Sequence, residues 1–332
     1  MNDVHYRPAW WVPGAHARTI WGKLVRRIPV VATRREQWDT PDGDVLDIER
    51  LDAPADRPRL VLLHGLEGTV RSHYVQGTLA EVARRGWSAD LVLFRSCGGT
   101  LNRARRFYHS GETGDLAFAL ERIMGEFPNT PLVMAGFSLG GNVLLKYLGE
   151  RGDAVPAAIR AAVAVSVPFD LDRGADHIDR GFARVYQASF MKSLKRKAYA
   201  KLEQYPNLYD RARLDAVRSI RDFDELVTAP LHGFADATDY YTQSSALRFL
   251  GGVRRPTLLL SAVDDPFLPP AVLDDVRAVG RVNPALTIEF VPEGGHVGFI
   301  SGTVPWRPIY YAERRVAGFL SHALRAPEAM SA

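Results

Sequence analysis

The sequence predicts an α/β fold, in which one mostly parallel sheet is flanked by helices and interrupted by a helical insertion. Short, nearly continuous apolar runs alternate with segments of helical periodicity, a pattern typical of parallel strands buried on both faces. A long stretch without any strand pattern, residues 168–252, separates two of these runs. The composition allows a sizeable core, because 46% of the 332 residues are hydrophobic and 24% are charged.

Eight strands are expected in this sheet. The first two form a hairpin around a turn at residues 41–44, and helical crossovers of right-handed sense join the later strands. The strands are expected at residues 30–38, 45–51, 60–63, 88–94, 132–135, 161–167, 257–263 and 287–291. The helices are expected at residues 74–85, 113–125, 139–149, 270–280 and 308–324.

These elements predict a single domain with three parts. An N-terminal arm of residues 1–27 precedes a core of residues 28–167 and 253–325. The strandless segment 168–252 is rich in Arg, Asp, Tyr and Phe and is expected to form several helices that leave the sheet edge and return to it. A cap over an active site is the favoured interpretation, and a plain helical insertion is the alternative.

Composition and charge exclude several classes of protein. The single cysteine, Cys97, excludes an internal disulfide framework and a Cys-rich metal centre. A net charge of +4 is too small for this length to indicate a nucleic-acid partner. No apolar run approaches the ~18 residues of a membrane span, and residues 1–18 lack the apolar core of a secretory signal. A soluble, cytoplasmic protein is therefore expected, and no oligomeric state is predicted.

The strongest chemical signal is a candidate nucleophile at Ser138. It lies in Gly136-Phe-Ser-Leu-Gly140, which matches G-x-S-x-G and joins an apolar run to a helical pattern. A sharp turn from strand to helix exposes the serine hydroxyl, and glycines on either side avoid clashes with neighbouring backbone. The alternative, a helix-capping serine in a glycine-rich turn, explains less of the surrounding sequence.

A second signal predicts the binding site of an oxyanion. A buried run ends in His64-Gly65-Leu66, followed by a loop and a helix. At this position a backbone amide, that of Leu66, can pair with the amide of Leu139 to bind a developing oxyanion. His64 is interpreted as a histidine that shapes the loop rather than as a base.

A serine nucleophile needs a base and an orienting carboxylate. Of the nine histidines, His296 follows the last predicted strand in a glycine-rich loop, so it is the candidate base. The candidate acid lies at the end of the preceding strand, where Asp264 and Asp265 compete. Asp265 is preferred because Pro269 follows it by four residues, as a proline usually follows the acid in the α/β-hydrolase pattern that this chain resembles. Asp264 then becomes a turn or capping residue.

Together these residues give a chain that resembles the α/β-hydrolase superfamily, and within it the YheT-like esterases related to the ABHD1–ABHD3 group. Further motifs carry the resemblance over nearly the whole chain: FRSCGGTLN at 94–102, YHSGETGDL at 108–116, SIRDFD at 219–224, TAPLHGF at 228–234, GGHVGF at 294–299 and, more loosely, GAHARTI at 14–20. One departure is Ser96, where the family often has glycine.

The resemblance implies a carboxylic-ester hydrolase that acts on short- to medium-chain acyl esters through an acyl-enzyme, with no cofactor and no metal. It assigns Ser138 as nucleophile, Asp265 as acid and His296 as base. Acyl transfer, phospholipase or thioesterase activity on the same residues is an alternative, and so is a lipid-binding protein with a vestigial site. A small-molecule ester or a lipid is the expected partner.

Some signals leave two interpretations open. Cys97 is interpreted as a packed residue rather than a thiol nucleophile, and the pair Tyr108-His109 either lines a pocket or belongs to a plain loop. Basic residues gather at 21–35 and at 190–202. The second stretch either makes a weak contact with an anionic membrane surface or, as favoured, forms a solvated helix face.

Overall fold

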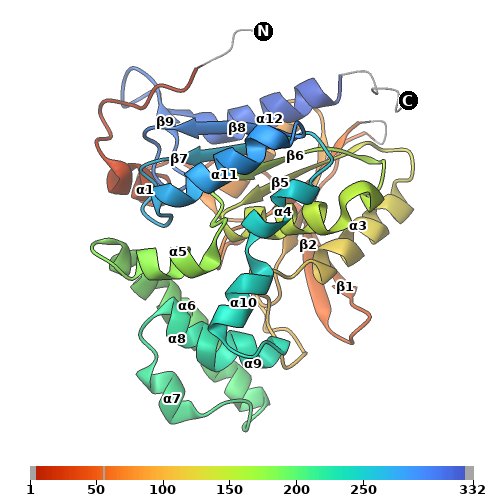
Figure 1. The fold of residues 1–332 in the computed structure, drawn as a ribbon. Helices are drawn as coiled ribbons and strands as arrows, with labels where there is room; N and C mark the ends of the chain where they lie inside the picture. Colours follow the sequence, from red (N-terminus) through yellow and green to blue (C-terminus); the bar gives the residue numbers. More distant parts are fainter. Residues whose placement is uncertain (1–4, 55–56, 326–332) are drawn as a thin grey trace.

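The computed structural model describes residues 5–54 and 57–325, and within them eight strands form one sheet in the order β1-β2-β4-β3-β5-β6-β7-β8 (Figure 1). β1 and β2 pair antiparallel with their neighbours, and the strands from β3 to β8 run parallel to one another. The predicted fold class is therefore confirmed. The first four residues of the expected N-terminal arm lie outside the described residues.

The strands and helices alternate along the chain as the apolar pattern predicts. The sheet strands are β1 (Arg34–Asp39), β2 (Val45–Leu51), β3 (Arg59–Leu63), β4 (Ser88–Leu93), β5 (Leu132–Phe137), β6 (Ile159–Val165), β7 (Thr257–Ala262) and β8 (Leu286–Val291). The helices outside the insertion are α1 (Ala15–Leu24), α2 (His73–Ala83), α3 (Gly114–Glu126), α4 (Leu139–Arg151), α11 (Pro270–Val282) and α12 (Tyr311–Ala323).

Helices cover both faces of the sheet and create two apolar layers. Side chains alternate along β3, so that Val61 and Leu63 join the layer formed with α3, α4 and α11, while Leu60 and Leu62 join the layer formed with α2 and α12. All four side chains are fully buried. This arrangement explains why the strands read as continuous apolar runs rather than as alternating ones.

Residues between β6 and β7 form the helical insertion, which Figure 1 shows grouped on one side of the sheet. Its helices are α5 (Leu171–Ile178), α6 (Ala183–Gln204), α7 (Arg211–Ala216), α8 (Ile220–Phe223), α9 (Ala229–His232) and α10 (Ala237–Ser244), with a π-helical turn (Asp224–Thr228) between α8 and α9 and a 3-10 segment (Ala246–Gly252) before β7. The insertion has apolar clusters of its own. No helix among the described residues has both the length and the apolar character needed to cross a bilayer.

Some predicted boundaries are wrong, each for a physical reason that the structure shows. The first strand begins at Arg34, not at residue 30, because the amide of Val31 donates to the Gln76 side chain (2.7 Å) before the ladder begins. β6 ends at Val165 because Ser166 has a positive φ of 51°. The last helix begins at Tyr311, since the preceding residues pair in a two-stranded ribbon of β9 (Ile300–Ser301) and β10 (Ile309–Tyr310).

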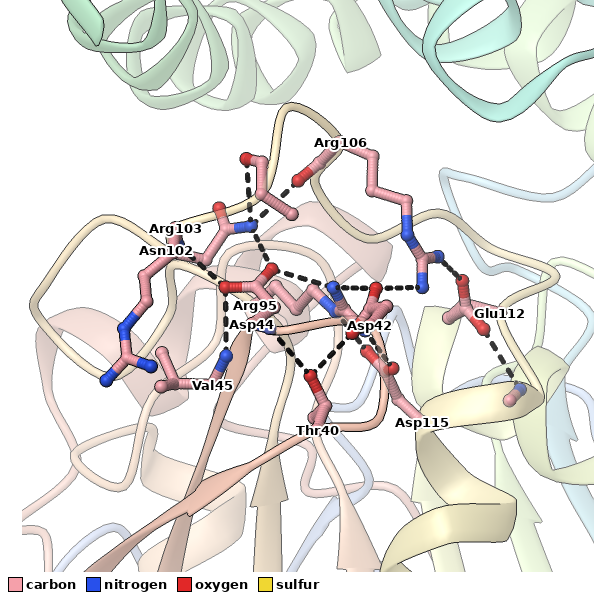
Figure 2. Close-up of polar contacts among 12 residues, drawn as sticks. Thr40, Asp42, Asp44, Val45, Arg95, Asn102, Arg103, Arg106, Glu112 and Asp115 are labelled. Carbon is pink, nitrogen blue, oxygen red and sulfur yellow. Dashed lines mark hydrogen bonds and ion pairs between the residues drawn. The ribbon is translucent and has the colours of Figure 1, made fainter.

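An ion-pair cluster around Arg95 holds the loop after β4 against the first hairpin (Figure 2). The buried guanidinium donates to Asp44 (2.7 Å), Asp115 (2.6 Å) and Asp42 (2.9 Å). The Asn102 side chain also donates to Asp44, at 2.6 Å. Although burial opposes ionisation, these hydrogen bonds and the charge of Arg95 lower the pKa of Asp44. The cluster fixes the loop that leads to Tyr108 and His109.

Replacing Arg95 with methionine is expected to lower the free energy of unfolding by about 3–5 kcal/mol, because Asp44 and Asp115 would remain buried without their cation. Urea unfolding at pH 7, followed by circular dichroism, measures the change. Arg103→Met is the matched control, because the pair between Arg103 and Asp39 is exposed and should contribute less than ~1 kcal/mol. Equal losses of unfolding free energy in the two variants would show that the buried ion pairs of Arg95 add no more stability than the exposed pair of Arg103.

Candidate active site

Ser138 occupies the turn between β5 and α4, with backbone angles φ 52° and ψ −121°. Such a conformation is strained for a residue with a side chain and is typical of functional turns. The flanking glycines permit it, since a Cβ on Gly136 would lie 2.4 Å from the Gly140 carbonyl oxygen, and one on Gly140 would lie 2.4 Å from the His64 carbonyl oxygen. The G-x-S-x-G pattern is therefore required by backbone packing.

The loops after β7 and β8 bring Asp265 and His296 to this serine. Nε2 of His296 lies 3.0 Å from Oγ of Ser138, and Nδ1 lies 2.8 Å from Oδ2 of Asp265. The Asp265 side chain is 1% exposed and that of His296 is 11% exposed. The Phe267 ring stacks on the imidazole with a centroid separation of 4.1 Å. With Nδ1–H donating to the carboxylate, Nε2 is free to accept the serine proton.

Asp264 turns away from the imidazole, although it precedes Asp265 directly. Its Oδ1 accepts hydrogen bonds from the backbone amides of Gly294 (2.7 Å) and Gly295 (2.8 Å), and Arg18 donates to its other oxygen at 3.3 Å. Asp264 thus ties together the backbone of the loop that carries His296. The structure divides the two aspartates between two tasks, as the alternation of side chains at a strand end requires.

The backbone amides of Leu66 and Leu139 are the candidate oxyanion donors. Gly65 packs close to Ser138, because a Cβ on Gly65 would lie 3.2 Å from Cβ of Ser138. The amides on either side of Leu66 are engaged: that of Gly65 donates to Tyr74 Oη (2.8 Å) and that of Glu67 to Tyr108 Oη (3.1 Å). Within the described residues, the N–H groups of Leu66 and Leu139 have no acceptor.

His64 holds this loop in place through two hydrogen bonds to backbone groups. Its Nδ1–H donates to the Gly65 carbonyl oxygen (2.7 Å), and its Nε2 accepts from the Phe94 amide (3.1 Å). Complete burial lowers its pKa to about 4, so the ring is neutral at pH 7. Both ring nitrogens are therefore occupied by backbone groups, which fits the interpretation of His64 as a residue that shapes the loop.

A cavity of about 150 Å³ opens beside Ser138. Its walls are mainly apolar and come largely from the insertion, including Leu171, Ile178, Leu194 and Phe223. Tyr108 and His109 also line it, which decides between the two interpretations of that pair. A cavity of this size with apolar walls admits a small apolar group rather than a strongly polar one.

A histidine and carboxylate cluster borders the same cavity. The candidate ligand atoms of His109, Glu112 and His232 lie within 4.8 Å of one another. The Glu112 oxygens already accept from Arg106 (2.6 Å) and from the Gly114 amide (2.9 Å). Internal hydrogen bonds thus account for the position of this carboxylate, and we assign no metal to it.

Several site residues carry no signal in the sequence pattern. Glu67 and Lys197 lie 130 residues apart and form an ion pair at 2.6 Å beside the cavity. Lys201, from the same basic stretch, is fully buried and donates to the carbonyl oxygens of Asn102 and Ala104. The interpretation of this stretch as a solvated face is therefore wrong for these two lysines, because tertiary contacts turn them inward.

Asp224, by contrast, lies within motifs that the family resemblance already marked. It is buried at the cavity, where Tyr241 Oη (2.8 Å) and Thr228 Oγ1 (2.6 Å) donate to it. Burial raises its pKa to about 6. Cys97 is also buried, and burial raises the pKa of its thiol to about 11, which disfavours the thiolate that a nucleophile requires.

Comparison with known proteins identifies the family. Residues 58–303 match the family model described as alpha/beta hydrolase fold. A protein of Escherichia coli (strain K12) that is named as an esterase, YheT, is 40% identical over 98% of this chain and 95% of its own length. The monoacylglycerol lipase of Saccharomyces cerevisiae is 30% identical over 84% of this chain and 62% of its own. The mouse phospholipase ABHD3 is 28% identical over 93% of this chain and 76% of its own.

Solved structures agree on the fold. The Pyrococcus furiosus esterase Pf2001 superposes with a TM-score of 0.59 at 18% identity, covering 90% of this chain and 98% of that one. The Pyrococcus horikoshii acylaminoacyl peptidase superposes with a TM-score of 0.55 at 14% identity, covering 92% and 43%. The chain therefore belongs to the α/β-hydrolase family, in which it is similar to YheT over nearly its full length and, at lower identity, to ABHD3.

Proposed function

We propose that the protein is a serine esterase that hydrolyses short- to medium-chain carboxylic esters through an acyl-enzyme. The observation that carries the proposal is the continuous hydrogen-bonded chain from Ser138 through His296 to Asp265 beside an apolar cavity. The relatives named as an esterase, a lipase and a phospholipase support the same substrate class. In this proposal residues 168–252 act as a cap, because their side chains line the cavity around the acyl chain.

The first half-reaction transfers the acyl group to the protein. Ser138 Oγ forms a bond to the ester carbonyl carbon while Nε2 of His296 takes the hydroxyl proton. The carbonyl oxygen becomes an oxyanion, which the N–H groups of Leu66 and Leu139 bind; each such donor contributes roughly 10²–10³ in rate. His296 then returns the proton to the leaving alcohol as the carbon–oxygen bond breaks.

The second half-reaction releases the acid. Water gives a proton to the same imidazole and attacks the acyl carbon, and Ser138 leaves with the proton restored to its oxygen. Throughout, Asp265 holds Nδ1–H and stabilises the imidazolium that forms twice in each cycle. None of these steps uses a metal or a cofactor.

The cavity volume leads to a prediction about chain length. An apolar cavity of this size is large enough for benzene, so p-nitrophenyl esters with acyl chains of about four to six carbons should be hydrolysed best. Assaying a series from acetate to palmitate gives the optimum. Ala175→Phe, which adds a ring to the cavity wall, should shift the optimum to shorter chains. An unchanged optimum in this folded variant would show that the acyl chain binds elsewhere.

A further inference from the structure

Glu67 lies directly after the candidate oxyanion donor Leu66 and holds an unusual backbone conformation. Its φ is 56°, in the left-handed region that favours glycine. Residues other than glycine remain in this region only when the surrounding contacts hold them there. The contacts of Glu67 therefore bear on the direction of the neighbouring Leu66 N–H.

Those contacts come from two separate parts of the fold. From the loop after β4, Tyr108 Oη donates to Oε1 of Glu67 (2.8 Å) and accepts from the Glu67 amide (3.1 Å). From α6 in the insertion, Lys197 Nζ donates to Oε1 (2.6 Å) and the Ser193 hydroxyl donates to Oε2. The Glu67 side chain is 9% exposed and that of Lys197 is 15% exposed.

This ion pair keeps the carboxylate charged inside the protein. Burial alone would raise the pKa of Glu67, but the charge of Lys197 and the hydrogen bonds from Lys197, Ser193 and Tyr108 lower it below the ordinary value. A buried carboxylate that loses its cation must protonate or move toward water. Because the same residue is strained in its backbone, loss of Lys197 would release the turn that contains Leu66.

We propose that Glu67 and Lys197 are a positioning pair, through which helix α6 of the insertion holds the Leu66 N–H in the direction required to bind the oxyanion. The proposal rests on the esterase function proposed above and adds to it a specific task for the insertion. Neither side chain takes part in a bond-making step; Lys197 acts on Glu67, and Glu67 acts on the backbone of the turn that carries the Leu66 N–H. Other contacts keep α6 docked, since Lys201 donates to two carbonyl oxygens of the loop after β4 at 2.7 and 2.8 Å.

The test compares Glu67→Gln, Lys197→Met and the double variant with the wild type. Two quantities are measured: kcat and KM for p-nitrophenyl butyrate, and the inhibition constant of butylboronic acid. The boronic acid bonds its boron to Ser138 Oγ, with the serine proton passing to His296, and so forms a tetrahedral anion that needs the oxyanion donors. Lys192→Met is the matched control, because Lys192 is an exposed lysine on the same helix.

Each single variant should lose about 100-fold in kcat, the contribution of one oxyanion donor, with KM within about threefold of wild type. Boronic acid affinity should fall in parallel. The kcat of the double variant should be no lower than that of the less active single variant, because the two residues act as one unit. Lys192→Met should behave as wild type.

Three results would overturn the proposal: kcat within about threefold of wild type in a folded Glu67→Gln protein, a loss confined to KM, or additive losses in the double variant. If Lys197→Met does not fold, Glu67→Gln decides alone, because glutamine keeps the shape and can still accept from Tyr108. A wild-type protein that neither hydrolyses the ester nor binds the boronic acid would instead refute the esterase function itself.

Discussion

Ser138→Ala is expected to abolish ester hydrolysis, with kcat reduced on the order of 10⁶-fold, while the protein remains folded. The hydroxyl oxygen is the atom that would bond to the substrate. Among the described residues, its only side-chain partner is Nε2 of His296, at 3.0 Å. Alanine keeps the Cβ and tolerates the backbone of this turn as well as serine does. The p-nitrophenyl series, run on both proteins side by side, measures the loss, and thermal unfolding checks the fold.

Ser189→Ala provides the control for this experiment, because Ser189 is exposed on α6. It should have wild-type kcat. Activity in Ser138→Ala equal to that of wild type would remove Ser138 from the mechanism. Adding ethanol to the wild-type assay also separates hydrolysis from acyl transfer, since transfer would form the ethyl ester. A protein that retains lipid but leaves Ser138 unacylated would favour the lipid-binding alternative.

Asp265→Asn is expected to reduce kcat about 10⁴-fold, although it changes one carboxylate oxygen to an amide nitrogen. The imidazole Nδ1–H would lose its carboxylate partner at 2.8 Å, and the amide would favour the tautomer whose Nε2 carries a proton and cannot act as a base. Steady-state kinetics of the purified variant measure the effect, which should lie in kcat rather than in KM.

Asp264→Asn is the matched comparison, since it makes the same chemical change one residue earlier. Asparagine can still accept from the Gly294 and Gly295 amides through its oxygen, so kcat should stay within about tenfold of wild type. A neutral asparagine would contact Arg18 less strongly than the aspartate does, so the free energy of unfolding should fall by about 1 kcal/mol. A larger loss of kcat at Asp264 than at Asp265 would reverse the assignment of the two aspartates.

The fold and the candidate nucleophile could be predicted because their signals are local in the chain. Burial of a parallel strand on both faces requires a continuous apolar run, so the positions of β3 to β7 follow closely from the sequence. The turn at Ser138 requires small residues at Gly136 and Gly140, where any Cβ would overlap backbone. Both requirements act within a few residues, and composition and spacing record them directly.

The edges of elements depended instead on contacts with distant parts of the chain. β1 begins late because Val31 bonds to the Gln76 side chain rather than to the ladder. The segment expected to start the last helix pairs with residues 300–301 in a ribbon. Neither partner is visible in the pattern of the segment itself, so the strand and the helix predicted from periodicity both begin too early.

The apolar pattern and the motif spacing were enough to predict the class of the sheet, its interruption by a helical segment, and a chain order of Ser138, then Asp264 or Asp265, then His296. The folded arrangement places Asp265, and not Asp264, against the imidazole, and it turns Lys197 inward to Glu67. The physical reason is the range of the interactions. Apolar periodicity and glycine turns are set by neighbouring residues, whereas an ion pair between residues 67 and 197 exists only after the sheet and the insertion have brought both side chains to the same cavity.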